Sequence, residues 1–384
     1  MIPMLRYALA LLMAAGLLSA CGEREGGVLS AQARNADGVW SQIPASVKSD
    51  LARGVNVSTW FTHRTDATQQ PGWPTTNDFS LMRRMGIRHV RLLVDAEWLQ
   101  LNGAHPRYLE EGITQALNEG LLVVLAMQPS KEHKLQMGED DSVVELVADI
   151  WRQTASQFKT VAHDRLLFEV LNEPEIEDVA RVRVIQKKLI EAVREISPER
   201  IVAVGGAHYS DIDDLVNMAP LDVRGVIYSF HFYEPHNFTH QGAGWGWHMW
   251  MVFHNIPYPS TPENVEPVVE KLTPLAREHI AWYGQQEWNK KKLAEFIDQA
   301  ADWSKRHNLP VWCSEFGVLR DVAPPASRRA WLNDARSLFE ERNMAWTYFD
   351  WWGHFGLVTG PQDARQIDED AQAGLALKLT QTTP

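Results

Sequence analysis

The chain has 384 residues, with 37 basic and 49 acidic side chains and a formal net charge of −12. An acidic surface repels phosphate backbones, so nucleic acid is excluded as the expected partner, whereas a neutral ligand is not. Sixteen tryptophans are many for this length. Tryptophan stacks well on flat, amphipathic surfaces such as sugar rings, although most tryptophans belong to a core.

The N-terminal residues have the pattern of a targeting segment. Arg6 precedes an apolar stretch, 7–18, that is too short to span a bilayer comfortably. The tetrapeptide LSAC, ending at Cys21, resembles a bacterial lipobox, in which cleavage leaves a lipidated cysteine. We therefore expect a lipoprotein signal peptide at 1–20 and a lipid anchor at Cys21. The alternative is an ordinary signal peptide with a chance cysteine.

The expected location is the cell envelope: the outer membrane, the periplasmic face or the cell surface. Gly22 stands where many inner-membrane lipoproteins carry an aspartate. Residues 21–50 are expected to form a tether and lead-in, because they begin with small and polar side chains. Cys313 is the one other cysteine, so the mature protein is expected to have no intrachain disulfide.

Strand-like and helix-like segments alternate through residues 51–384, which we expect to form one catalytic domain. The predicted strands are 54–58, 87–95, 121–127, 166–171, 201–205, 226–233, 310–316 and 345–351, and the predicted helices are 77–85, 106–119, 142–159, 179–196, 212–218, 291–307, 326–342 and 371–379. This order predicts an α/β fold, a single (β/α)₈ TIM barrel with a long aromatic-rich loop after the sixth strand. A doubly wound sheet is the competitor, but no Gly-x-Gly-x-x-Gly turn follows the first strand.

Polar residues end the fourth strand in the segment LLFEVLNEPE. Its apolar run is typical of a strand covered on both faces, and Pro174 cannot donate a ladder hydrogen bond. Between them lie Asn172 and Glu173. On its own, this pattern is equally consistent with a solvated strand end.

Other strands carry polar residues where the same rim is expected. Arg91 is expected at the end of the second strand, His231 and Tyr233 share one face of the sixth, and Glu315 ends the seventh. Each alone fits a surface ion pair, a core histidine or a solvated strand end, but unrelated residues would scatter over both ends of the barrel. Two carboxylates beside a histidine, a tyrosine and tryptophans fit glycoside hydrolysis, in which one acid protonates the leaving oxygen and the other attacks the sugar.

Metal and cofactor chemistry is not expected. The sequence has no His-Glu-x-x-His motif and no tight cysteine or histidine spacing, and His236 and His240 lie among aromatic and glycine residues.

The motifs GVNVSTWF, LNEP, HFYEPHNFTHQG and SEFG, on the first, fourth, sixth and seventh strands, resemble glycoside hydrolase family 5, the cellulase-type family of clan A. Its members are retaining (β/α)₈ hydrolases of β-linked polysaccharides, and the resemblance covers roughly residues 54–379. It implies roles for six residues: Glu173 as acid/base, Glu315 as nucleophile, Asn172 as partner of the sugar 2-hydroxyl, Arg91 as support of the nucleophile, and His231 and Tyr233 as cleft-lining side chains.

These roles agree with simple electrostatics. A guanidinium and a phenol hydroxyl favour an ionised, acceptor-only nucleophile. The acid/base needs a raised pKa, which partial burial and a neighbouring carboxylate are expected to provide. The two carboxyl groups of a retaining enzyme should stand about 5–5.5 Å apart.

Two positions depart from the family pattern, and one insertion is added to it. Gln128 stands near the usual histidine after the third strand, and Phe349, before Asp350, stands where the family has its sugar-stacking tryptophan. Gln128, Phe349 and the nearby Trp351 are candidate substrate contacts, but the identity of the platform stays open. The loop after the sixth strand contains Trp245 and is expected to form a wall of the sugar cleft, with Trp245 as a substrate contact; the alternative is that its aromatic side chains only pack the loop down.

We expect a retaining endo-β-glycanase that hydrolyses β-1,4-linked polysaccharide by double displacement, with β-glucan as the leading substrate. The alternatives are a β-mannanase or a hydrolase of an exopolysaccharide that the cell itself secretes. From another class, a non-catalytic carbohydrate-binding barrel would have lost a glutamate, and both are present. The expected partners are a β-linked polysaccharide and, through Cys21, a membrane, and the protein is expected to be a monomer.

Overall fold

The computed structural model describes residue 40 and residues 42–61, 74–100 and 104–380. The predicted signal peptide, Cys21 and most of the predicted tether lie outside these residues. Among the described residues, no helix has both the length and the apolar character needed to cross a bilayer.

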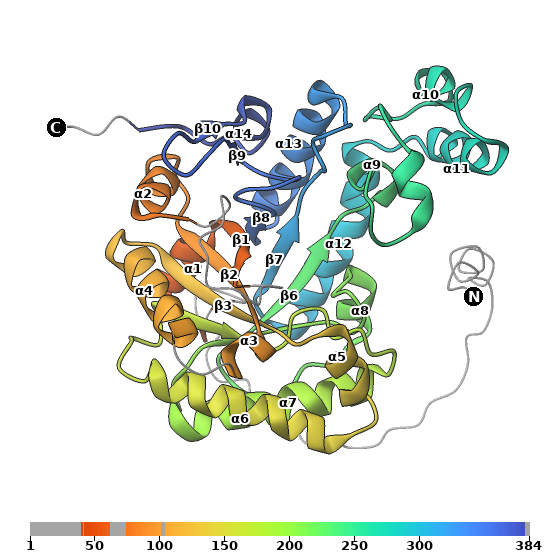
Figure 1. The fold of residues 1–384 in the computed structure, drawn as a ribbon. Coiled ribbons are helices and arrows are strands. Elements are labelled where there is room, and N and C mark those ends of the chain that lie inside the picture. The colour runs from red at the N-terminus through yellow and green to blue at the C-terminus, as the bar shows by residue number, and fades with distance from the viewer. Residues whose placement is uncertain (1–39, 41, 62–73, 101–103, 381–384) are drawn as a thin grey trace, which may run out of the picture. The chain divides into compact units, whose positions relative to one another are not determined.

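Eight parallel strands form a closed barrel, as predicted (Figure 1). Closure occurs where β1 pairs with both β2 and β8. The strands are β1 (Arg53–Phe61), β2 (His89–Asp95), β3 (Leu122–Gln128), β4 (Leu166–Glu169), β5 (Val202–Gly205), β6 (Val226–Phe232), β7 (Val311–Phe316) and β8 (Ala345–Tyr348). A separate two-stranded sheet, β9 (Val358–Thr359) with β10 (Gln366–Ile367), follows the last barrel strand.

Helices cover the outside of the barrel and follow the strands in turn (Figure 1). The principal ones are α2 (Thr76–Arg84), α4 (Ala104–Asn118), α6 (Asp141–Gln157), α7 (Val179–Ile196), α8 (Ile212–Asn217), α12 (Lys290–His307), α13 (Pro325–Glu341) and α14 (Glu369–Gly374). The sequence explains their ends. For example, the Asp178 side chain caps the first turn of α7, and Asn308 ends α12 in the left-handed conformation.

Two apolar layers result from the alternation of side chains along each strand. In β3, Val123 belongs to the large core between strands and helices, whereas Val124 belongs to a second core inside the barrel. The inner core includes Val47 and Leu51 of α1 (Ala45–Leu51), which packs with the amino-terminal ends of the strands. A groove of about 520 Å³ lies at this end, beside Trp40 of the inner core. The site was predicted at the carboxyl-terminal ends of the strands, which form the opposite end of the barrel.

Several predicted boundaries were wrong. β4 ends at Glu169 rather than at residue 171. Beyond Glu169 the hydrogen bonding becomes irregular, because the Val170 amide donates to Ala203 of β5 whereas the Asn172 amide donates to Met127 of β3. β8 ends at Tyr348 rather than residue 351. The closing helix α14 lies at 369–374 instead of 371–379.

The region predicted as a long loop after the sixth strand contains short helices. They are α9 (His236–Thr239), the 3₁₀ helix η2 (His248–Val252), α10 (Pro262–Val269) and α11 (Pro274–Gln285). Thr261-Pro262 and Thr273-Pro274 begin the two longer ones, and proline at the first helical position is a start signal that the sequence analysis missed. Short helices α3 (Ala96–Gln100) and α5 (Lys131–Met137) also follow β2 and β3.

Candidate active site

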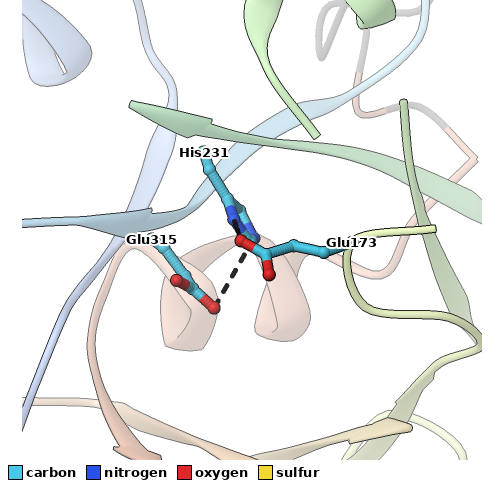
Figure 2. Close-up of side chains that lie close together, drawn as sticks. All are labelled: Glu173, His231 and Glu315. Atoms are coloured by element: carbon cyan, nitrogen blue, oxygen red, sulfur yellow. Dashed lines mark hydrogen bonds and ion pairs between the residues drawn. The ribbon is translucent and has the colours of Figure 1, made fainter. Parts of the chain in front are cut away.

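Glu173, His231 and Glu315 meet at the carboxyl-terminal rim of the barrel (Figure 2). They come from the turn after β4, from β6 and from β7. Nδ1 of His231 lies 3.0 Å from Oε1 of Glu173, and its Nε2 lies 3.6 Å from Oε1 of Glu315. One oxygen of each glutamate and one imidazole nitrogen all lie within 4.8 Å of one another. The structure therefore brings together the two predicted carboxylates.

Local backbone geometry aims these side chains. Glu173 has φ 44° and Glu175 has φ 56°, and the amide of Glu175 donates to the His208 carbonyl at 2.8 Å. Left-handed non-glycine residues cost about 1–3 kcal/mol each and gather at functional sites. On the other side, the β6–β7 register shifts between Phe230 and His231 and then places His231 opposite Glu315. Such irregularities re-aim side chains at barrel rims.

Glu315 is held by two donors. Nη1 of Arg91 lies 2.7 Å from Oε1, and the Tyr233 hydroxyl donates to Oε2 at 3.0 Å. Burial raises the pKa of Tyr233 well above its usual value, and the neighbouring Glu315 charge raises it further, so the phenol remains a donor. This environment suits an ionised carboxylate that only accepts hydrogen bonds.

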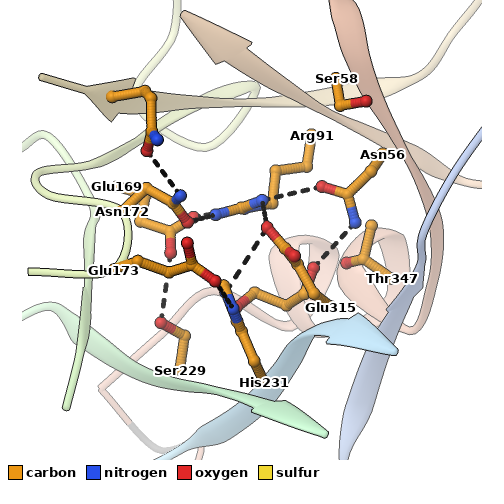
Figure 3. Close-up of polar contacts among 12 residues, drawn as sticks. Asn56, Ser58, Arg91, Glu169, Asn172, Glu173, Ser229, His231, Glu315 and Thr347 are labelled. Atoms are coloured by element: carbon orange, nitrogen blue, oxygen red, sulfur yellow. Dashed lines mark hydrogen bonds and ion pairs between the residues drawn. The ribbon is translucent and has the colours of Figure 1, made fainter. Parts of the chain in front are cut away.

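Arg91 lies inside the barrel, three residues into β2, and not at the strand end as predicted (Figure 3). Its guanidinium reaches four side chains. Nε lies 2.6 Å from Glu169, Nη1 donates to Asn56 at 2.8 Å as well as to Glu315, and Nη2 donates to Asn172 at 2.5 Å. Although burial lowers the pKa of Arg91, the charges of Glu169 and Glu315 outweigh it and raise the pKa. The arginine therefore stays charged.

Sequence reasoning missed Asn56 and Glu169. Both are buried in strands and point into the barrel (Figure 3). A signal was present for Glu169, because a carboxylate inside the run LLFEVL requires a buried partner.

Gln128 orients Asn172. The Asn172 amide donates to Oε1 of Gln128 at 2.7 Å, while its own oxygen accepts from Arg91. Both sides of the amide are thereby specified, which fixes its rotation. Gln128 thus lies at the site, where it contacts Asn172.

The pKa of Glu173 differs from the prediction. Burial raises it, but the hydrogen bond and the charge of His231 lower it more, with a smaller contribution from Lys134, so its pKa lies below the usual value. Burial lowers the pKa of His231, whereas the charges of Glu315 and Glu173 and the hydrogen bond to Glu173 raise it overall. A neighbouring carboxylate was expected to raise the pKa of Glu173, but His231 lowers this pKa instead. The two side chains hold a proton as a pair.

Aromatic side chains surround Phe355 near the carboxylates of Glu173 and Glu315. Its ring centroid lies 6.0 Å from that of Tyr233, 5.5 Å from that of Phe349 and 6.4 Å from that of Trp245. Trp245 is 49% exposed, and Phe349 is half-buried. These two predicted contacts therefore remain available to a ligand. Phe355 itself was not predicted.

Trp351 was predicted to contact substrate, and the structure contradicts this. Its side chain is fully buried, and its indole donates to Asp78 at 3.1 Å. The preceding Asp350 is also buried beside the site, and it accepts from the Ser58 hydroxyl and the Trp351 amide. Burial raises the pKa of Asp350 to about 7.

Glu173, His231 and Glu315 are close enough to bind a cation. However, Arg91 already places a guanidinium 2.7 Å from Glu315, and this charge would repel a metal ion. The donors around the carboxylates fit an acid and a nucleophile better than a metal site.

A (β/α)₈ barrel with two glutamates meeting at its carboxyl-terminal rim is the architecture of a glycoside hydrolase. Residues 50–355 match the family described as cellulase (glycosyl hydrolase family 5), and the chain belongs to this family.

Relatives support this assignment. Endoglucanase C of Acetivibrio thermocellus is 27% identical over 315 residues, which cover 77% of this chain and 90% of the relative. Cellodextrinase A of Ruminococcus flavefaciens is 24% identical over 314 residues, 77% of this chain and 84% of the relative. The crystal structure of endoglucanase Cel5A from Thermotoga maritima shares the fold, with a TM-score of 0.71 at 21% identity, over 86% of this chain and 98% of that structure.

Proposed function

We propose that the protein is a retaining endo-β-1,4-glucanase in which Glu173 is the acid/base and Glu315 the nucleophile. The observation that carries this proposal is that one oxygen of Glu173 and one oxygen of Glu315 lie within 4.8 Å of each other, in different environments. Retaining enzymes hold their two carboxyl groups about 5–5.5 Å apart, whereas inverting enzymes hold them about 6.5–9.5 Å apart to admit a water molecule, so the close oxygens favour the retaining arrangement. Arg91 and Tyr233 donate to Glu315, and His231 is the neighbour of Glu173.

The reaction has two displacements. A carboxylate oxygen of Glu315 bonds to the anomeric carbon while the bond to the leaving sugar breaks, and Glu173 gives its proton to the leaving oxygen. Glu173, now ionised, then takes a proton from water, whose oxygen attacks the same carbon and releases the Glu315 carboxylate. His231 shares the proton that Glu173 donates in the first step, because the two side chains are in contact, and the proton taken from water restores it to the pair.

The names of the relatives support a β-1,4-glucan substrate, since they are an endoglucanase and a cellodextrinase. A β-mannan or a self-produced exopolysaccharide is the alternative, because Gln128 and Phe349 depart from the family pattern at positions predicted to contact the sugar. The intact catalytic groups argue against a purely binding role. We further propose that Cys21 anchors the enzyme to a membrane of the cell envelope, which would place it close to polysaccharide that leaves the cell.

Hydrolysis of a panel of β-glucans, mannans and xylans tests this proposal. Release of reducing ends from a β-1,4-glucan, with an early fall in viscosity, is expected of an endo-acting enzyme, whereas release without a fall in viscosity indicates exo action. Proton NMR during the first turnovers should show the β-anomer as the initial product. An initial α-anomer would contradict the assigned roles, and no hydrolysis of any polymer would favour the binding protein.

A further inference from the structure

We infer that Glu169 is a positioning residue that keeps Arg91 paired while Glu315 is covalently bound to the sugar. This inference rests on the double displacement proposed above. Glu169 lies at the end of β4, points into the barrel beneath the catalytic pair, and is 1% exposed (Figure 3).

Arg91 lies between two carboxylates and contacts each of them through a different guanidinium nitrogen. Nε contacts Glu169 at 2.6 Å and Nη1 contacts Glu315 at 2.7 Å, and the arginine side chain is fully buried. Among the described residues, the other side-chain acceptors of Arg91 are the neutral amide oxygens of Asn56 and Asn172. Glu169 and Glu315 are thus the two anions that compensate the buried guanidinium.

This balance changes during the reaction. When Glu315 bonds to the anomeric carbon, its carboxylate becomes a neutral ester. Among the described residues in contact with Arg91, Glu169 is then the remaining carboxylate. A buried cation without a counter-ion is strongly destabilised, so the charge of Glu169 matters more in the intermediate than in the free enzyme.

Loss of that charge should therefore have opposite effects on the two steps. Formation of the intermediate removes the Glu315 charge and should become slower. Breakdown of the intermediate restores the Glu315 charge beside Arg91 and should become faster. A side chain that only maintained the fold would slow both steps when it was replaced.

The experiment uses 2,4-dinitrophenyl 2-deoxy-2-fluoro-β-cellobioside with the wild type and Glu169→Gln. Dinitrophenolate leaves with the bonding electron pair and needs no proton, and the fluorine slows both steps so that the labelled enzyme accumulates. We expect inactivation to be roughly tenfold slower in Glu169→Gln, and reactivation in buffer roughly tenfold faster. Reactivation is a first-order property of labelled molecules, so it does not depend on the yield of folded variant.

Two further variants complete the test. Asp368→Asn removes the carboxylate partner, at 2.9 Å, of another buried arginine, Arg328, and should lower the melting temperature while leaving both rate constants unchanged. Glu169→Asp keeps the charge but withdraws it from Arg91, so both constants should shift in the same opposite directions, by about threefold. Glu169→Asp takes the place of Glu169→Gln in this test if Glu169→Gln does not fold. Unchanged or equally slowed constants in the Glu169 variant that folds would overturn the inference, whereas a wild type without label on Glu315 would overturn the proposed function.

Discussion

The His231 imidazole lies between the two glutamates, with Nδ1 3.0 Å from Glu173 and Nε2 3.6 Å from Glu315. The pKa of His231 is raised by these carboxylates, and the pKa of Glu173 is lowered by the histidine, although burial opposes both shifts. The pair therefore keeps one proton up to a pH above the ordinary histidine value of about 6.5. In the proposed mechanism, this proton is the one that the leaving sugar needs.

The first prediction concerns pH dependence. In the wild type, kcat/KM on an aryl cellobioside with a poor leaving group should fall as pH rises through the raised pKa of the pair, above about 6.5. In His231→Gln, Glu173 must hold the proton alone, so the basic limb should move down by roughly one pH unit. A dinitrophenyl cellobioside needs no proton and should show no such limb in either protein. An unmoved basic limb in His231→Gln would contradict the pairing.

The second prediction separates the two glutamates. Glu315→Ala cannot form the covalent intermediate and should lose at least about a thousandfold in rate, even on the dinitrophenyl substrate. Glu173→Ala should still cleave that substrate, but the intermediate should accumulate because no base activates water. Added azide should release it as the β-glycosyl azide, detectable by NMR. An α-azide from Glu173→Ala would reverse our interpretation of the site.

The third prediction concerns the phenol beside the nucleophile. Tyr233→Phe removes the donor that lies 3.0 Å from Oε2 of Glu315, and kcat should fall by about tenfold to a hundredfold. Tyr258→Phe removes a hydroxyl that donates to Asp334 at 2.9 Å, and serves as the matched control with unchanged kcat. Equal activity of both variants would show that the Tyr233 hydroxyl does not support the reaction.

The fourth prediction concerns the insertion after β6. Trp245 is 49% exposed beside His354 and Phe355, whereas Trp282 is 53% exposed on α11. Trp245→Ala should lower polymer hydrolysis by about fivefold or more, and should leave hydrolysis of a short aryl glycoside and the melting temperature nearly unchanged. Trp282→Ala should alter none of these. A large fall in melting temperature with normal specific activity would show that Trp245 only packs the loop.

The fifth prediction concerns the proposed anchor. If Cys21 is lipidated, Cys21→Ser should move the protein from the membrane fraction to the soluble fraction, because the acyl chains supply the membrane affinity. Fractionation followed by immunoblotting measures this, and mass spectrometry of the wild-type N-terminal peptide should detect the lipid. Unchanged membrane association of Cys21→Ser would rule out the anchor.

The sequence by itself determined the barrel, its strand order and most of the groups at its rim. Eight apolar runs separated by amphipathic helices have few other arrangements, and polar residues such as Glu173 and Glu315 stood out where those runs end. Family motifs then specified a glycoside hydrolase. These conclusions depend on local pattern, which a single sequence displays directly.

Only the tertiary structure decided how these groups share charge. Glu169 and Asn56 lie within strands, so nothing local relates them to Arg91, which lies at a distance along the chain and meets them only when the barrel closes. The lowered pKa of Glu173 likewise depends on an imidazole from β6. Trp351 proved to be a core residue, and Asp78 of α2 accepts the hydrogen bond from its buried indole. Charge balance and burial are sums over neighbours from many strands, and those neighbours exist only in the folded chain.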